Sequence, residues 1–238
     1  MANFLLIHGA CHGGWCWERV TPLLEAAGHS VVAPNLLGHG DDTTPMSELS
    51  LERYGEYVAE LAVSNGPVVL VGHSMAGAVI SRVAEAVPDQ IEMLIYLTAY
   101  LAISGESLAS LARCDADALT ASERVEIDGV DCFAIPRDAT RRAFYQDASD
   151  ADFEAAMARI EPEPVSIFRE KAVLTEDHFD RVPRSYIHCT LDKAIGYTLQ
   201  REMVRDTPCA PVLTLECGHS PFVTMPQELA KALLSLCE

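Results

Sequence analysis

Basic side chains are scarce in this sequence of 238 residues. Lysine and arginine together number 17 against 35 aspartates and glutamates, which gives a formal net charge of −18 at pH 7. Phosphate backbones and anionic lipid surfaces are themselves negative, and no basic stripe in the chain offsets the acidic balance. We therefore expect neither a nucleic acid nor a membrane as a partner.

Long hydrophobic runs are also missing. The first apolar stretch, Phe4 to Ile7, is short and has no basic flank, so it predicts a strand and not a signal peptide or a membrane-spanning helix. Repeats, low-complexity tracts and flexible linkers are absent, and the hydrophobic content of 49% is that of an ordinary globular protein. We expect one sizeable α/β domain in the cytoplasm.

Three kinds of binding motif do not occur. The eight cysteines form no C-x-x-C pair, and the group Cys11, His12 and Cys16 fits no standard zinc spacing, so reduced and mostly buried thiols are expected. Neither G-x-G-x-x-G nor a G-K-[ST] ending is present, which argues against a dinucleotide or phosphate site. We expect no metal and no organic cofactor.

Strand-like and helix-like segments alternate along both ends of the chain. We expect strands over 3–7, 30–35, 68–71, 91–98, 185–190 and 211–216, and helices over 17–27, 51–64, 75–87, 196–205 and 226–236. A helix between consecutive strands favours parallel pairing. The pattern predicts an α/β fold in which a six-stranded, mostly parallel sheet carries helices on both faces.

The alternation stops between the fourth and fifth predicted strands. Residues 103–184 are rich in acidic residues, arginine and alanine with helical patterning, as in "DADFEAAMARI" at 150–160. An insertion at this point lies at the strand ends and can cover a site there. We therefore expect a helical cap over 103–184, here called the cap segment, on a core formed by 1–102 and 185–238.

The stretch "VVLVGHSMAG" at 68–77 places Ser74 between a buried strand and a helix. It approximates the G-x-S-x-G elbow, in which a sharp turn lifts the serine hydroxyl above the sheet. Ala76 replaces the last glycine of the motif, and Gly77 follows at once. The simpler alternative is a serine that caps a helix, but the buried strand before it favours a nucleophile.

A serine hydroxyl needs a base and a group that orients the base. Asp192 follows the fifth predicted strand, and His219 follows the sixth. Since the carboxyl ends of parallel strands share one edge of the sheet, we expect Ser74 as nucleophile, His219 as base and Asp192 as its partner. His73 is expected to pack behind the elbow.

Acyl transfer also requires donors for the developing oxyanion. We expect the Met75 amide at the helix start and the Ala10 amide in "IHGACHGGW" to supply them. A plain glycine-rich turn is the alternative interpretation of that loop. Gly9, His12 and Ser220 are expected to line the substrate pocket.

Four segments carry a resemblance to a known family: "FLLIHGACHGGWCWERVTPLLEAAGHSV", "LVGHSMAG", "YIHCTLDKAI" and "ECGHSPFVTMPQEL". They resemble the α/β-hydrolase branch of plant methylesterases, methyl salicylate esterase, hydroxynitrile lyases and bacterial carboxylesterases such as pyrethroid hydrolases. The likeness covers nearly the whole chain and is weakest over 104–139. It implies a serine carboxylesterase that forms an acyl-enzyme on a small or medium uncharged ester, and a homodimer.

Two other functions are compatible with the same fold. The hydroxynitrile lyases of this branch use a threonine in the first loop and a lysine directly after the catalytic histidine, where this chain has Gly9 and Ser220. A non-catalytic ligand receptor is the other alternative, because fold alone does not fix function. No partner surface is evident in the sequence, so we expect ester hydrolysis.

Overall fold

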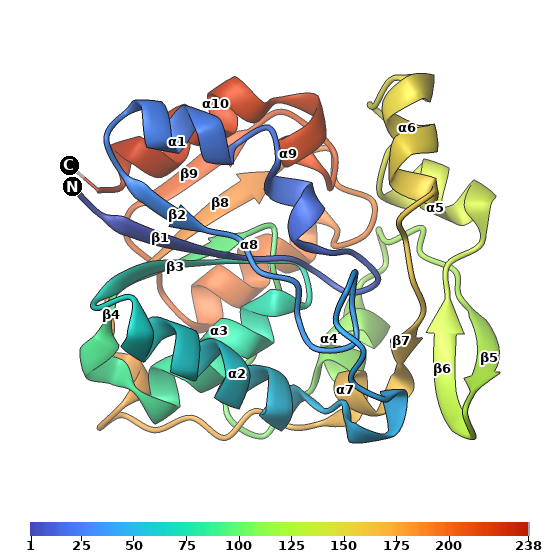
Figure 1. Ribbon diagram of the computed structural model, residues 1–238, viewed down its shortest axis with the longest axis horizontal. Helices are drawn as coiled ribbons and strands as arrows, with labels where there is room; N and C mark the ends of the chain where they lie inside the picture. Colours follow the sequence, from blue (N-terminus) through green and yellow to red (C-terminus); the bar gives the residue numbers. More distant parts are fainter. Residues whose placement is uncertain (238) are drawn as a thin grey trace.

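The computed structural model describes residues 1–237, and a parallel sheet lies at its centre (Figure 1). The strand order is β2-β1-β3-β4-β8-β9, and every neighbouring pair is parallel. The strands are β1 (Asn3–Ile7), β2 (Ser30–Val32), β3 (Val68–His73), β4 (Ile91–Leu97), β8 (Arg184–Cys189) and β9 (Val212–Leu215). The expected six-stranded sheet is thus confirmed in the described part of the chain.

Helices cover both faces of this sheet (Figure 1). On one face lie α1 (Thr21–Ala26) and α10 (Pro226–Ser235), and on the other α2 (Leu51–Ser64), α3 (Ala76–Ala86) and α8 (Tyr197–Asp206). Along β1, Leu5 packs in the core on the α2 and α3 side, whereas Phe4 and Leu6 pack on the α1 and α10 side. The central strands β1 and β3 are buried on both faces, which is why their apolar runs show no polar alternation.

Two element boundaries differ from the sequence prediction. Strand β2 ends at Val32 and not at residue 35, because Pro34 has no N–H to donate to a sheet. Helix α1 begins at Thr21 with Pro22 in its first turn, and a short 3₁₀ helix over Gly14–Trp17 takes the place of the predicted helix start. Further 3₁₀ turns lie at Met46–Glu48, Pro88–Gln90 and Phe179–Arg181.

The cap segment contains strands as well as helices. Its helices are α4 (Leu108–Cys114), α5 (Arg137–Ala143), α6 (Asp150–Met157) and α7 (Val165–Arg169), and its strands are β5 (Glu123–Ile127), β6 (Val130–Ala134) and β7 (Glu163–Pro164). The three strands form an antiparallel sheet in the order β5-β6-β7. The expectation of a purely helical cap was therefore incomplete.

The strands of this hairpin, and not its turn, explain the omission. Asp128 and Gly129 join β5 to β6 with φ angles of 51° and 79°. Asp-Gly with both residues at positive φ is a strong local signal for a two-residue hairpin. The flanking strands are short and rich in charge, so their hydrophobic pattern alone did not indicate them.

The carboxyl ends of the central strands meet at one edge of the sheet. Ser74 follows β3, Thr98 follows β4, and Asp192 and His219 lie in the loops after β8 and β9. In residues 1–237 no helix is both long and apolar enough to cross a membrane.

Candidate active site

Ser74 occupies the tight turn between β3 and α3. Its φ angle is 56°, a left-handed conformation that non-glycine residues rarely adopt, and the residue is 9% exposed. The turn is closely packed: a Cβ on Gly77 would lie 2.1 Å from the Tyr100 carbonyl oxygen. Gly77, one position after the motif's last site, therefore allows the start of α3 to pack against the Tyr100 carbonyl. Ala76, which replaces the last glycine of the motif, is buried in this turn. Strained backbone of this kind is often found at functional sites.

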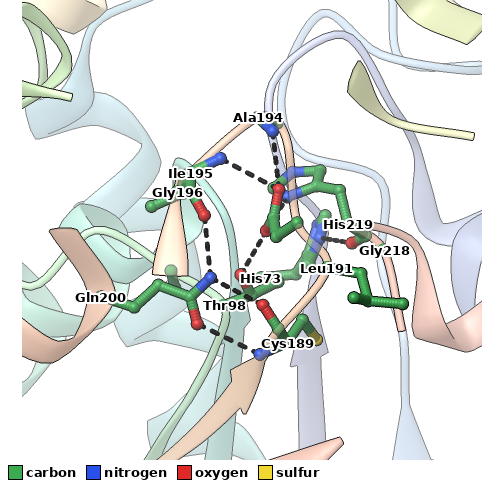
Figure 2. Close-up of polar contacts among 12 residues, drawn as sticks. His73, Thr98, Cys189, Leu191, Ala194, Ile195, Gly196, Gln200, Gly218 and His219 are labelled. Carbon is green, nitrogen blue, oxygen red and sulfur yellow. Dashed lines mark hydrogen bonds and ion pairs between the residues drawn. The ribbon is translucent and has the colours of Figure 1, made fainter. Parts of the chain in front are cut away.

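Asp192 and His219 are paired in the buried edge of the sheet. The Nδ1–H of His219 donates to Oδ2 of Asp192 at 2.7 Å, and both side chains are completely buried. Oδ1 of Asp192 accepts hydrogen bonds from the amides of Ala194 at 2.6 Å and Ile195 at 3.0 Å (Figure 2). These donors stabilise a buried carboxylate and fix its orientation toward the imidazole.

Thr98 is a site residue that the sequence analysis missed. Its hydroxyl donates to Oδ2 of Asp192, the same oxygen that accepts from His219 (Figure 2). Thr98 is the last residue of the fourth predicted strand, so its place at the carboxyl edge was the available signal. The hydrogen bond itself depends on the parallel pairing of β4 with β8, which the local sequence does not specify.

Gln200 on α8 supports the loop that carries Asp192. Its Nε2 donates to the carbonyl oxygens of Cys189 at 3.0 Å and Ile195 at 2.8 Å, and its Oε1 accepts from the Cys189 amide at 3.1 Å (Figure 2). Gln200 is completely buried. It thus bridges the chain before and after Asp192, and the sequence analysis did not identify it.

The second ring nitrogen of His219 has no protein partner within residues 1–237. The ring lies against Phe144, with centroids 5.1 Å apart, and against His73, with centroids 4.5 Å apart. Because Nδ1 carries the proton donated to Asp192, Nε2 of a neutral His219 has a free lone pair. A base for a serine hydroxyl needs such a nitrogen.

His73 packs behind the elbow, where the sequence analysis expected it. Its Nε2–H donates to the carbonyl oxygen of His219 at 2.8 Å, and the ring is 1% exposed. Burial, together with the neighbouring His219, lowers the pKa of His73 well below its ordinary value. His73 is therefore neutral and joins the elbow to the loop after β9.

The Ala10 and Met75 amides have no acceptor among the hydrogen bonds of residues 1–237. The carbonyl of Ala10 accepts from His12, and that of Met75 accepts from Ala78, so only their N–H groups are unengaged. Ala10 and Ser74 both line one cavity of about 370 Å³. Met75 is the N-cap residue of α3 and is fully buried.

The cavity is enclosed mainly by apolar side chains. Aromatic residues supply much of the wall. The cap segment contributes most of it, including Phe133, Phe144, Val165 and Phe168, and the core contributes Tyr100 and Ile195. Arg113 and Arg124 also reach this wall and are otherwise exposed. The guanidinium of Arg124 pairs with Asp131.

The three residues expected to line the pocket lie beside it, since none belongs to the cavity wall in the described chain. His12 has both ring nitrogens engaged: Nδ1–H donates to Ala10 O at 2.8 Å, and Nε2 accepts from the Tyr145 hydroxyl at 2.7 Å. Burial lowers its pKa to about 4. Ser220 is fully buried at the start of α9 (Pro221–Thr224). A Cβ on Gly9 would lie 2.8 Å from the Ser74 Cβ, so the Gly9 backbone packs directly against the elbow.

The thiols are as expected from the sequence. All eight cysteines are free, and five of them are buried. Within residues 1–237 no group of three or more histidine, cysteine, aspartate or glutamate side chains is arranged to hold a metal ion.

Comparison with known proteins identifies the family. The model of the alpha/beta hydrolase family matches residues 4–232. The chain belongs to this family. Methylesterase 2 of Arabidopsis thaliana is 32% identical over 99% of this chain and 96% of its own length, and a pyrethroid hydrolase of Sphingobium wenxiniae is 32% identical over 100% and 88%.

Solved structures agree with this alpha/beta hydrolase assignment. Polyneuridine aldehyde esterase matches with a TM-score of 0.89 and 25% identity, covering 100% of both chains. An Arabidopsis methylesterase matches with a TM-score of 0.88 and 25% identity, covering 100% of this chain and 99% of the other. The overall fold is therefore that of an alpha/beta hydrolase.

Proposed function

We propose that this protein is a serine carboxylesterase that hydrolyses small or medium uncharged esters through an acyl-enzyme. Ester hydrolysis is the activity named for the methylesterase and pyrethroid hydrolase relatives, each about a third identical over nearly the whole chain. The observation that carries the proposal is the pairing of His219 with Asp192, which leaves Nε2 free at the edge of the sheet that bears Ser74.

In the proposed mechanism, the Ser74 hydroxyl attacks the ester carbonyl while Nε2 of His219 takes its proton. Asp192 holds the imidazole in the required tautomer and stabilises the imidazolium that forms. The Ala10 and Met75 amides donate to the oxyanion of the tetrahedral intermediate. His219 then protonates the leaving alcohol.

Deacylation uses the same groups, with water in place of the Ser74 hydroxyl as the nucleophile. His219 takes a proton from a water molecule, which attacks the acyl carbonyl, and the tetrahedral intermediate again forms in the oxyanion hole. Collapse of the intermediate releases the carboxylic acid and returns the proton to Ser74. The chemistry needs only side chains, two amides and water.

The cavity supports the proposed substrate class. About 370 Å³ enclosed mainly by aromatic and aliphatic side chains suits a small or medium apolar ester. The net charge of −18 disfavours the approach of anionic substrates. We also infer that 103–184 acts as a cap domain on a core of 1–102 and 185–238, since most of the cavity wall comes from the cap segment.

Two further parts of the proposal concern the state of the protein in the cell. Free thiols are typical of reducing compartments, which supports a cytoplasmic location. A homodimer is proposed from the resemblance to plant esterases, and light scattering at micromolar concentration tests it.

A panel of esters tests the proposed substrate class. Purified protein is assayed with p-nitrophenyl, methyl-aryl and pyrethroid-type esters, each paired with an analogue that carries a carboxylate away from the ester bond. We expect the uncharged member of each pair to have the higher kcat/KM. Failure to hydrolyse any uncharged ester, or a consistent preference for the carboxylates, contradicts the proposal.

A further inference from the structure

A buried carboxylate in the cap segment is not used by the proposed chemistry. Glu163 of β7 is completely buried and accepts three hydrogen bonds: from the Tyr54 hydroxyl at 2.8 Å, the Cys11 amide at 3.0 Å and His39 Nε2 at 3.1 Å. The donors lie on α2, on the loop after β1 and on the loop after β2. A buried carboxylate is costly unless it is bonded in this way.

His39 forms an ion pair with Glu163. Its Nε2 faces the carboxylate, and its Nδ1 faces the Leu37 carbonyl oxygen at 3.1 Å, so both nitrogens must donate. Burial lowers the pKa of His39, but the charge and hydrogen bond of Glu163 outweigh burial, and the pKa is raised. The pair joins the cap segment to the core by a charged contact out of reach of solvent.

The bond from Cys11 to Glu163 lies one residue from a proposed oxyanion donor. Cys11 has a φ of 64°, so it holds a left-handed conformation that non-glycine residues rarely adopt. The peptide between Ala10 and Cys11 is fixed at both ends: Ala10 O accepts from His12 Nδ1 at 2.8 Å, and Cys11 N–H donates to Glu163. Without Glu163, this buried N–H loses its acceptor.

The other peptides of the same loop are also fixed. The Gly9 carbonyl, which shares a peptide unit with the Ala10 N–H, accepts from His8 Nδ1 at 2.8 Å. The Cys11 carbonyl accepts from the Glu161 amide at 3.0 Å. The direction of the Ala10 N–H is thus set by a chain of contacts in which Glu163 is the charged member from the cap segment.

We propose that Glu163 is a positioning residue for the oxyanion hole, which holds the Gly9–His12 loop so that the Ala10 amide points at the developing oxyanion. The inference rests on the proposed ester hydrolysis. Val165, two residues after Glu163, lines the substrate cavity. One short stretch of the cap segment therefore contacts both the cavity and the oxyanion loop.

Four substitutions separate positioning from simple stability. Glu163→Ala removes all three hydrogen bonds, and Glu163→Gln keeps the size and an acceptor oxygen but removes the charge. Glu161→Gln is the matched control for loss of an acidic side chain, since the Glu161 carboxylate accepts from the Gly40 amide, whereas its bond to the Gly9–His12 loop comes from the backbone amide, which the substitution keeps. Tyr54→Phe removes a different bond to Glu163 and leaves the bond from Cys11 in place.

The measurement combines kinetics with an inhibitor that forms an oxyanion. Loss of a complete oxyanion donor costs about 10²–10³ in kcat, so a misdirected donor in Glu163→Ala is expected to lower kcat by about 10- to 100-fold. We expect KM to change less than about threefold, affinity for an aryl trifluoromethyl ketone to fall in parallel with kcat, and product-acid binding to be unchanged. Glu163→Gln is expected to show an intermediate loss and is decisive where Glu163→Ala does not fold.

Other outcomes overturn the inference. A folded Glu163 variant with normal kcat, or one whose kcat falls no more than that of an equally destabilised Tyr54→Phe, shows a role in stability alone. A raised KM with intact kcat shows a role in substrate binding. If the proposed function itself is wrong, Ser74→Ala retains the ester hydrolysis of the unmodified protein. That result distinguishes failure of the proposed function from failure of the inference about Glu163.

Discussion

Nδ1 of His219 lies 2.7 Å from Oδ2 of Asp192, and both side chains are removed from solvent. The carboxylate is already oriented by the Ala194 and Ile195 amides, so it fixes the ring before any substrate binds. This preorganisation is the geometric basis of the proposed mechanism.

Asp192→Asn is expected to reduce kcat by about 10⁴-fold, because an amide favours the wrong tautomer of His219. The amide oxygen can still accept from Ala194 and Ile195, so the fold should persist with little change in Tm. Steady-state kinetics with an aryl acetate and thermal unfolding measure the two effects. Asp150→Asn is the control, since that exposed carboxylate pairs only with Arg141 at the surface. Activity that survives in Asp192→Asn but is lost in Asp150→Asn would place the acid in the cap segment.

The cap segment also contacts the loops that carry the proposed triad. Oδ2 of Asp147 accepts from the Gly218 amide at 2.7 Å, directly before His219, and Gln146 Nε2 donates to Leu191 O at 2.7 Å, directly before Asp192. Asp147→Ala is expected to lower kcat by about three- to tenfold, which corresponds to about 1 kcal/mol for a partly solvated hydrogen bond. Asp150→Ala provides the comparison. Equal kinetics for the two variants shows that the Asp147 contact does not position His219.

Acid pH is expected to destabilise the fold through buried neutral histidines. The pKa of His12 is lowered by burial to about 4, so between pH 6.5 and 4 the unfolded chain binds a proton that the folded chain does not. Its stabilising contribution, on the order of 3 kcal/mol, is complete above pH 6.5 and is lost as the pH falls toward 4. Urea unfolding at pH 7 and pH 5 measures the loss, which His12→Asn should reduce and His178→Asn at the surface should not. The same loss in all three proteins contradicts this origin.

Ester cleavage is expected to exceed cyanohydrin cleavage. Released cyanide needs a nearby cation, and the position after His219 holds the buried, neutral Ser220. Gly9 offers no hydroxyl for a cyanohydrin, and a side chain there would crowd Ser74. Parallel assays with mandelonitrile and an aryl acetate decide the matter. Enzyme-dependent cyanide release faster than acetate release reverses the ranking.

The end of β3 was predictable because a strand buried on both faces appears as an unbroken apolar run. The strands β8 and β9 mix polar and apolar residues, but their alternation with helices showed where their carboxyl ends lie. Those three ends were enough to bring Ser74, Asp192 and His219 to one edge as candidates. Thr98 was missed because its hydrogen bond to Asp192 depends on which strands pair, a property that no local pattern records.

The cap segment was the least predictable part of the chain. The Asp128–Gly129 turn carried a usable hairpin signal, but its strands are short and charged. Glu163 had no local signal: an acidic residue in an acidic segment is normally a solvated one, and its contact with Cys11 spans 152 positions of sequence. Pocket roles for His12 and Ser220 were inferred from their places in the first loop and directly after the proposed base, whereas their burial depends on tertiary packing.

The central claim is that Ser74 is the nucleophile, and the most direct measurement is hydrolysis of an aryl acetate by Ser74→Ala. Ser122→Ala is the matched control, because that serine lines the same cavity and has no assigned role. With circular dichroism showing both variants folded, we predict that Ser74→Ala loses about 10⁴-fold or more in kcat and all labelling by a fluorophosphonate, and that Ser122→Ala stays within a few-fold of the unmodified protein. Near-normal turnover by folded Ser74→Ala would contradict the account.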